Sequence, residues 1–222
     1  MVYVMSDLHG KYKLFLEMLK LIQFSDKDTL YILGDVVDRG EEPVKILLHI
    51  MKSKNIHLIL GNHEQMLLDS ERHNFNYFCY DTQLWASNGG LTTYDELMTL
   101  NEDTRKEIIS FLKKIPYKKE IEVENKKFIL VHGCYGKSKE TILWNRMNEN
   151  IQRPMDSTII FGHTPTCNYQ SDFPFVIWKK DNLIDIDCGL ARQKPNFSQL
   201  GCLRLNDLKE FYLTFTREKK NE

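Results

Sequence analysis

One short stretch constrains the fold of this chain more than any other: an apolar run followed at once by two aspartates and an arginine. Residues 29–33 predict a buried strand, and the heptapeptide GDVVDRG at positions 34–40 comes directly after it. The carboxyl ends of strands in an open α/β sheet are where ligands bind. The stretch therefore predicts a ligand site at the end of a strand.

Two more apolar runs end in polar clusters of the same kind. Residues 2–5 are followed closely by the tetrapeptide DLHG, and residues 56–60 directly precede the tetrapeptide GNHE. Helical patterns with an apolar face separate the three runs, over residues 14–22 and 43–51. The β-α-β-α-β order predicts parallel strands with right-handed crossovers, which brings all three clusters to one edge of a single sheet.

The rest of the chain predicts a helical insertion and then further strands. Residues 64–116 are mostly helical in pattern, and we expect them to form a cap-like insertion over the strand ends. Two hairpins are expected, the first with its turn at Asn125-Lys126 and the second over residues 201–215. Residues 1–222 are expected to form one α/β domain, with residues 217–222 as a frayed tail.

Composition narrows the class of protein further. The chain carries 30 basic and 31 acidic residues, a net charge of −1, which argues against general affinity for nucleic-acid polymers or membranes. The five cysteines form no Cys-x-x-Cys pair, so we expect reduced thiols and a cytoplasmic location. The N-terminus shows neither a signal peptide nor a membrane-spanning run.

The polar residues at the predicted strand ends share a definite chemistry. Their mixed oxygen and nitrogen donors suit Mn, Fe or Zn better than soft metals. A carboxylate such as Asp35 is able to bridge two cations, which would clamp the reacting oxygens of a phosphoester and lower the pKa of a bound water. Arg39 supplies a planar fork that matches phosphate oxygens. The full set is Asp7, His9, Asp35, Asp38, Arg39, Asn62, His63, His132 and His163.

Taken singly, each of these residues has an ordinary explanation. An aspartate at a strand end is usually a turn former, and an isolated arginine is usually a solvated surface charge. What favours a shared site is that five strand ends carry such residues beside a glycine. The set as a whole predicts metal-dependent phosphoester hydrolysis.

In their order along the chain, these motifs resemble the signature set of the calcineurin-like metallophosphoesterases. Within that family they are most similar to the compact bacterial and phage members of the serine/threonine protein phosphatase superfamily. The resemblance spans residues 2–205, and it implies two central mixed sheets packed as a β-sandwich and flanked by helices. The matching blocks are DLHG at 7–10, GDVVDRG at 34–40, GNHE at 61–64, LWNR at 143–146, FGHTP at 161–165, IDCG at 186–189 and the pair His132-Gly133.

The resemblance implies a metal-binding role for six residues. Asp7 and His9 would hold the first divalent cation, and Asp35 would bridge both. The second would be completed by Asn62, His132 and His163. Two Mn²⁺ ions are the implied cofactors, with Fe or Zn as alternatives, and a metal-bound hydroxide would be the nucleophile.

The resemblance also implies roles in catalysis and phosphate binding. His63 would be the general acid that protonates the leaving alkoxide, and Asp38 would orient it. Arg39 would bind the phosphate. Arg146 is a candidate second phosphate-binding arginine, the alternative being an ordinary surface arginine on a loop.

The sequence favours a serine/threonine protein phosphatase that acts on phosphorylated proteins, with a small phosphorylated substrate left open. The alternative is a diadenosine tetraphosphate hydrolase, in which an aromatic such as Tyr77, Phe78, Tyr80 or Trp85 would stack on a base. These aromatics are otherwise expected in the core of the cap, which is the preferred interpretation. A non-catalytic binding module is disfavoured because every expected ligand is present. The oligomeric state stays open, and a monomer fits the sequence.

Overall fold

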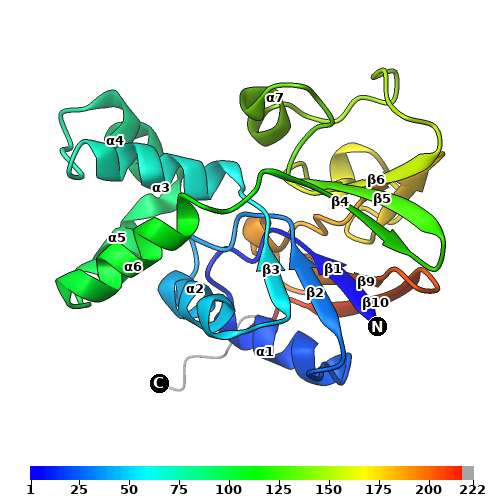
Figure 1. The fold of residues 1–222 in the computed structure, drawn as a ribbon, viewed down its shortest axis with the longest axis horizontal. Coiled ribbons are helices and arrows are strands. Elements are labelled where there is room, and N and C mark those ends of the chain that lie inside the picture. Colours follow the sequence, from blue (N-terminus) through cyan, green and yellow to red (C-terminus); the bar gives the residue numbers. More distant parts are fainter. Residues whose placement is uncertain (217–222) are drawn as a thin grey trace.

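Two five-stranded mixed sheets form the centre of the computed structural model, which describes residues 1–216 (Figure 1). The first sheet runs in the order β10 (Lys209–Thr214), β9 (Gln199–Arg204), β1 (Val2–Met5), β2 (Thr29–Ile32) and β3 (Ile56–Leu58). The second runs β4 (Lys118–Val123), β5 (Lys126–Val131), β6 (Ser157–Phe161), β8 (Leu183–Asp185) and β7 (Trp178–Lys180). The predicted α/β fold with two sheets is therefore confirmed.

Successive side chains of a strand point to opposite faces of its sheet, which explains how the two sheets pack face to face. On β1, Val4 belongs to the buried cluster between the sheets, whereas Tyr3 and Met5 pack toward the helices of the first sheet. On β5, Leu130 faces the space between the sheets and Ile129 faces the outer side of the second sheet. Both faces of these strands are buried, so they are almost continuously apolar in sequence.

The parallel strands β1, β2 and β3 end at the same edge of the first sheet. Val2 is paired with Thr29 and Met5 with Ile32, and β2 pairs in parallel with β3. The crossovers are α1 (Tyr12–Leu21) and α2 (Pro43–Lys52), which begins with a proline at its first position. The expected β-α-β-α-β order is thus present, and its three polar clusters lie at one sheet edge.

Residues 62–112 form a helical lobe beside α2 (Figure 1). Its elements are α3 (Asn62–Arg72), α4 (Tyr80–Trp85), the π-helical turn η1 (Ala86–Gly90), α5 (Leu91–Met98) and α6 (Glu102–Leu112). Leu97 and Ile108 are fully buried in the core that the lobe shares with α2. Residues 62–112 are therefore mostly helical, and they pack as an extension of the main core.

The C-terminal half contributes short helices around the second sheet. They are α7 (Lys139–Trp144) and the 3₁₀ turns η2 (Thr166–Asn168) and η3 (Leu190–Arg192). The first hairpin turns one residue earlier than expected, because Glu124 and Asn125 take the left-handed φ values of 49° and 59° that a two-residue hairpin loop requires. The second hairpin, β9–β10, lies where it was predicted. The predicted frayed tail, residues 217–222, lies outside the described residues.

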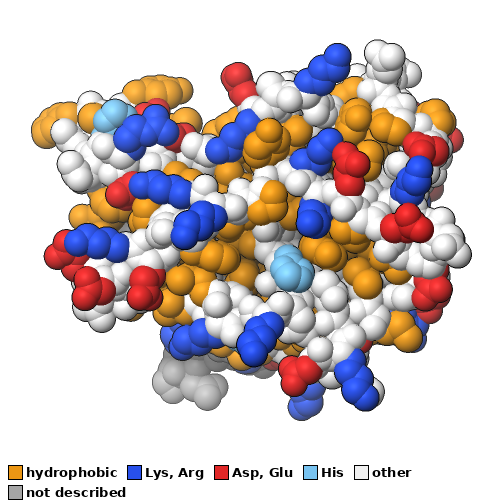
Figure 2. All heavy atoms as spheres, viewed as in Figure 1, with side chains coloured by type: hydrophobic (Ala, Val, Ile, Leu, Met, Phe, Trp, Pro, Cys, Tyr) orange, Lys and Arg blue, Asp and Glu red, His pale blue; other side chains and the backbone are white. Residues whose placement is uncertain are grey.

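Charged side chains of both signs are interspersed on the face shown in Figure 2. That face therefore carries no broad field of one sign, in keeping with the near-zero net charge of the sequence. Among residues 1–216, no helix is long and apolar enough to cross a membrane.

Truncation of Leu130 tests the core between the sheets. Leu130→Ala removes a fully buried side chain and is expected to lower the free energy of unfolding by about 2–5 kcal/mol, measured by urea denaturation. Leu21→Ala, at an exposed position on α1, is the matched control and should change it by less than about 0.5 kcal/mol. Equal effects of the two substitutions would contradict the sandwich packing.

Candidate metal and phosphate site

The loops after the strands hold their polar residues in a backbone conformation that residues other than glycine rarely adopt. Left-handed φ angles are found at Asp7 (55°), His9 (40°), Asp35 (54°), Asp38 (69°), Arg39 (67°) and His163 (68°). Such backbone costs of order 1–3 kcal/mol per residue and persists only where surrounding contacts impose it. Its concentration at the strand ends where the two sheets meet the polar cluster indicates a site built for function.

The buried Glu64 carboxylate holds two of these loops together. It accepts hydrogen bonds from the backbone N–H groups of Asp35 (2.9 Å), Val36 (2.8 Å), Val37 (3.3 Å) and Gly61 (2.9 Å). The first three belong to the loop after β2, and Gly61 caps α3. The sequence reasoning gave Glu64 no such role, although its spacing from Gly61 is that of a capping box.

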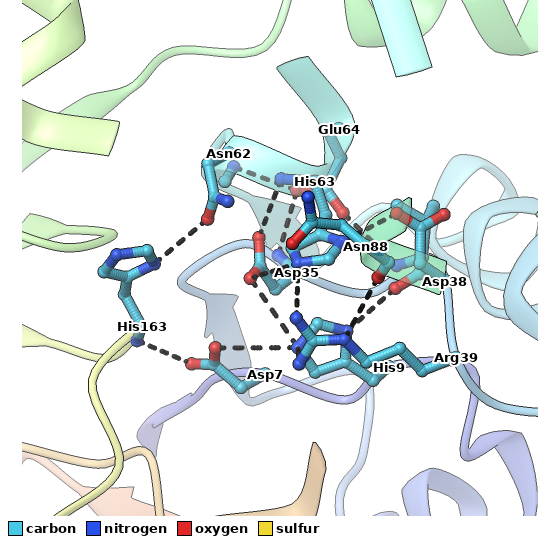
Figure 3. Close-up of polar contacts among 12 residues, drawn as sticks. Asp7, His9, Asp35, Asp38, Arg39, Asn62, His63, Glu64, Asn88 and His163 are labelled. Carbon is cyan, nitrogen blue, oxygen red and sulfur yellow. Dashed lines mark hydrogen bonds and ion pairs between the residues drawn. The ribbon is translucent and has the colours of Figure 1, made fainter. Parts of the chain in front are cut away.

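Asp35 lies at the centre of the site (Figure 3). Its Oδ2 is 3.6 Å from His9 Nε2 and 3.8 Å from His63 Nε2, whereas its Oδ1 is 3.3 Å from His132 Nε2. The backbone N–H of His63 also donates to Oδ1, at 3.1 Å. The two oxygens of this carboxylate thus face different histidines.

Two groups of donor atoms share Asp35, each with all its atoms within 4.8 Å of one another. One group is His9, Asp35 and His63, and the other is Asp35, His132 and His163. Asn62 Oδ1 adds to the second group, 2.8 Å from His132 Nε2 and 3.0 Å from His163 Nδ1. Sequence reasoning expected the members of the second group together with Asn62.

Asp7 lies at the edge of this cluster. Its Oδ1 is 4.0 Å from His9 Nε2, and its Oδ2 accepts a hydrogen bond from the backbone N–H of His163 at 3.0 Å. The structure therefore brings all six predicted metal ligands together. The first group, however, contains His63 and not Asp7.

Burial sets the protonation states of these groups. Burial lowers the pKa of His9 well below its usual value, and burial together with His132 lowers the pKa of His163 to about 3. Both imidazoles are therefore neutral near pH 7 and offer lone pairs, as metal binding requires. Burial, reinforced by the charge of Asp7, raises the pKa of Asp35. A cation would offset that cost, so this donor set fits divalent metal ions.

His63 is joined to Asp38 by a short hydrogen bond. His63 Nδ1 lies 2.6 Å from Asp38 Oδ2, and both side chains are buried. Burial alone would lower the pKa of His63, but the Asp35 charge and the bond to Asp38 outweigh it, so the pKa is raised. The arrangement places the Nδ1 proton toward Asp38 and leaves Nε2 directed into the site.

Arg39 lies across the two histidines of the first group. Its Nη2 lies 2.9 Å from His63 Nε2, and its Nη1 donates to His9 Nε2 at 3.3 Å (Figure 3). Its side chain is exposed, unlike the groups beneath it. A guanidinium in this position is accessible to an anion that approaches the cluster.

Arg146 lies outside this network. It is exposed, and its charge contributes to the lowered pKa of His163, after burial, His132 and His63. It is therefore in electrostatic reach of the cluster, and its proposed contact with phosphate stays a prediction.

The four aromatics of the insertion divide into two kinds. Trp85 is 2% exposed and its indole N–H donates to Asp38, so its expected place in the core of the lobe is correct. Tyr77 (62%), Phe78 (93%) and Tyr80 (74%) are exposed, and the same expectation is wrong for them. They follow the far end of α3, about 16 Å along the helix from Asn62.

Known proteins share both sequence and fold with this chain. A family model described as calcineurin-like phosphoesterase matches residues 1–167. The serine/threonine-protein phosphatase 2 of Salmonella typhimurium is 32% identical over 180 residues, covering 73% of this chain and 78% of that protein. The symmetrical bis(5'-nucleosyl)-tetraphosphatase of Buchnera aphidicola (subsp. Schizaphis graminum) is 28% identical over 204 residues, covering 82% and 74%.

A solved structure matches this chain in its fold alone. The structure of a protein serine/threonine phosphatase from Saccharomyces cerevisiae superposes with a TM-score of 0.58 at 16% identity. The match covers 100% of this chain and 81% of that one. The two proteins share their architecture.

Removal of the central carboxylate tests the donor arrangement. Asp35→Asn is expected to reduce the Mn²⁺ content, measured by elemental analysis after dialysis, from about two ions per chain to fewer than one, because one side chain serves both donor groups. Asp95→Asn, at an exposed position on α5, is the matched control and should keep the full content. Undiminished metal in Asp35→Asn would show that the ions bind elsewhere.

Proposed function

This chain belongs to the calcineurin-like phosphoesterase family, and from that premise we propose that it is a metal-dependent serine/threonine protein phosphatase. The observation that carries the proposal is the 32% identity to the Salmonella phosphatase across most of both chains. The alternative, hydrolysis of a dinucleoside polyphosphate, is supported by the Buchnera relative. Both reactions are phosphoester or phosphoanhydride hydrolysis at one type of centre.

Two divalent cations are the cofactors in this proposal, with Mn²⁺ as the first candidate. Asp7, His9 and Asp35 would hold one, and Asp35, Asn62, His132 and His163 would hold the other. When bound, such ions supply Lewis-acid charge and a nucleophilic water at neutral pH. The remaining steps fall to side chains of the chain itself.

His63 is the proposed general acid. As water adds to phosphorus and the bond to the serine or threonine oxygen breaks, that oxygen would take the proton from His63 Nε2, giving free alcohol and phosphate. The raised pKa of His63 keeps the imidazolium available near neutrality. Asp38 holds Nδ1 and thereby aims Nε2 at the leaving group.

Arg39 is the proposed phosphate-binding residue, and Arg146 a second one. The Arg39 guanidinium lies against His63 Nε2, so a phosphate oxygen that bound it would bring the ester oxygen near the general acid. The exposed position of Arg39 suits a substrate carried on another protein.

The aromatic residues favour the phosphatase over the nucleotide hydrolase. A base-stacking surface needs exposed rings close to the phosphates. Trp85 is buried against Asp38, and the exposed rings of Tyr77, Phe78 and Tyr80 lie beyond the far end of α3. Hydrolysis of a phosphorylated serine or threonine needs no base-stacking surface.

A direct comparison of substrates tests the proposal. With Mn²⁺-loaded protein, kcat/KM for phosphoserine and phosphothreonine peptides is expected to exceed that for diadenosine tetraphosphate by more than ~10²-fold, about 2.7 kcal/mol of transition-state binding. Asp35→Asn serves as the blank. The reverse ranking would assign the chain to the nucleotide hydrolases.

Replacement of the general acid tests the catalytic roles. His63→Asn is expected to lower kcat for a phosphopeptide by ~10²–10⁴-fold while the Mn²⁺ content stays at the wild-type value, because only proton transfer is lost. His57→Asn, at an exposed position on β3, is the control. A parallel loss of metal would make His63 a ligand, as its closeness to His9 and Asp35 permits.

A further inference from the structure

The segment that joins α4 to α5 reaches from the lobe into the site. We call residues 85–93 the junction segment; it comprises Trp85, the π-helical turn η1 and the first residues of α5. Single π-helical turns inside α-helices are frequent at functional sites. Apart from Trp85 as a candidate base-stacking aromatic, sequence reasoning assigned this segment no role, yet it contacts both Asp38 and Arg39.

Asp38 receives its other hydrogen bonds from the junction segment. The Thr93 hydroxyl donates to Asp38 Oδ1 at 2.6 Å and accepts from the Asp38 backbone N–H at 2.9 Å. The Trp85 indole N–H lies 3.1 Å and 3.0 Å from Asp38 Oδ1 and Oδ2. Together with His63, these donors occupy both oxygens of a fully buried carboxylate, which fixes the plane of the carboxylate relative to the imidazole.

Two glycines make these contacts possible. A Cβ atom on Gly90 would lie 2.5 Å from atoms of the Trp85 ring, so only glycine lets the indole fold back toward Asp38. A Cβ atom on Gly89 would lie 2.7 Å from Arg39 Cγ. Gly89 also has a backbone φ of 99°, which residues other than glycine rarely adopt.

Backbone carbonyls of the junction segment hold Arg39 in place. The Arg39 backbone N–H donates to the Gly89 carbonyl at 3.1 Å, and Arg39 Nε donates to the Asn88 carbonyl at 3.3 Å. With Nε engaged, the terminal nitrogens Nη1 and Nη2 are directed toward His9 and His63. One segment therefore fixes both the partner of the general acid and the phosphate-binding arginine.

We propose that the junction segment is a positioning element for the reaction, in which Thr93 and Trp85 orient His63 through Asp38 and Gly89 seats Arg39. The inference rests on the proposed role of His63 as general acid, but not on which phosphoester is the natural substrate. The side-chain hydrogen bonds of Thr93 and Trp85 in the site go to Asp38, so we assign both residues an action through that carboxylate.

The dependence of the rate on the leaving group of the substrate tests whether a residue positions the general acid. Nitrophenolate is a stable anion that departs without a proton, whereas phenolate is more basic and benefits from protonation as it leaves. A loss of general-acid alignment therefore slows phenyl phosphate much more than p-nitrophenyl phosphate. A merely structural defect slows both alike.

The experiment compares these two substrates in Mn²⁺-loaded variants. Thr93→Val removes the hydroxyl at nearly constant volume and is expected to lower kcat at least about tenfold on phenyl phosphate and less than about threefold on p-nitrophenyl phosphate. Thr93→Ser keeps the hydroxyl and should restore most of the activity. Thr99→Val, at an exposed position just after α5, is the matched control and should change neither rate.

Trp85→Phe provides an independent variant, because it removes the indole donor and keeps an aromatic ring. It should show the same selectivity between the two substrates as Thr93→Val. Urea unfolding of each variant verifies that it is folded before the rates are compared. Gly89→Ala should instead raise the inhibition constant of inorganic phosphate and leave the ratio of the two rates unchanged.

The outcomes separate this inference from the proposed function. A selective loss on phenyl phosphate that Thr93→Ser rescues supports the positioning role, whatever the natural substrate is. Equal losses on both substrates, or no loss in either Thr93→Val or Trp85→Phe, would overturn it. Failure of the phosphopeptide assay alone would overturn only the protein phosphatase assignment.

Discussion

The buried carboxylate of Glu64 is the contact on which the rest of the site depends. Its hydrogen bonds to four backbone N–H groups join the loop after β2 to the beginning of α3. Asp35 follows one strand and Asn62 and His63 begin the helix that follows another, so this one side chain sets the distance between them. Without it, several buried N–H groups would lose their partner, at a cost of about 1–3 kcal/mol each.

The backbone conformations and buried charges of the site lower the stability of the folded chain. The site concentrates left-handed backbone at Asp7, His9 and Asp35 and buries carboxylates whose charge would be better solvated in water. Burial lowers the pKa of His9 and His163 and raises that of Asp35. The raised pKa of Asp35 marks a free-energy cost of burying its charge, which a bound cation would reduce, and the two well-packed sheets supply the stability that permits it.

The sheet edge could be predicted because its signals are local in sequence. Each apolar run and the polar cluster after it fall within about ten residues, and parallel crossovers then leave little choice of arrangement. The junction segment could not be predicted, because Thr93 and Trp85 meet Asp38 across 55 and 47 residues. Nor does an aromatic residue reveal its burial when its segment lacks a period, as Tyr77 and Phe78 illustrate.

Anomalous diffraction from crystals soaked in Mn²⁺ would show whether the six gathered side chains hold two cations around Asp35. We expect two Mn²⁺ peaks that share the Asp35 carboxylate, one beside Asp7 and His9 and one beside Asn62, His132 and His163. A single peak, or two peaks of which only one contacts Asp35, would contradict it.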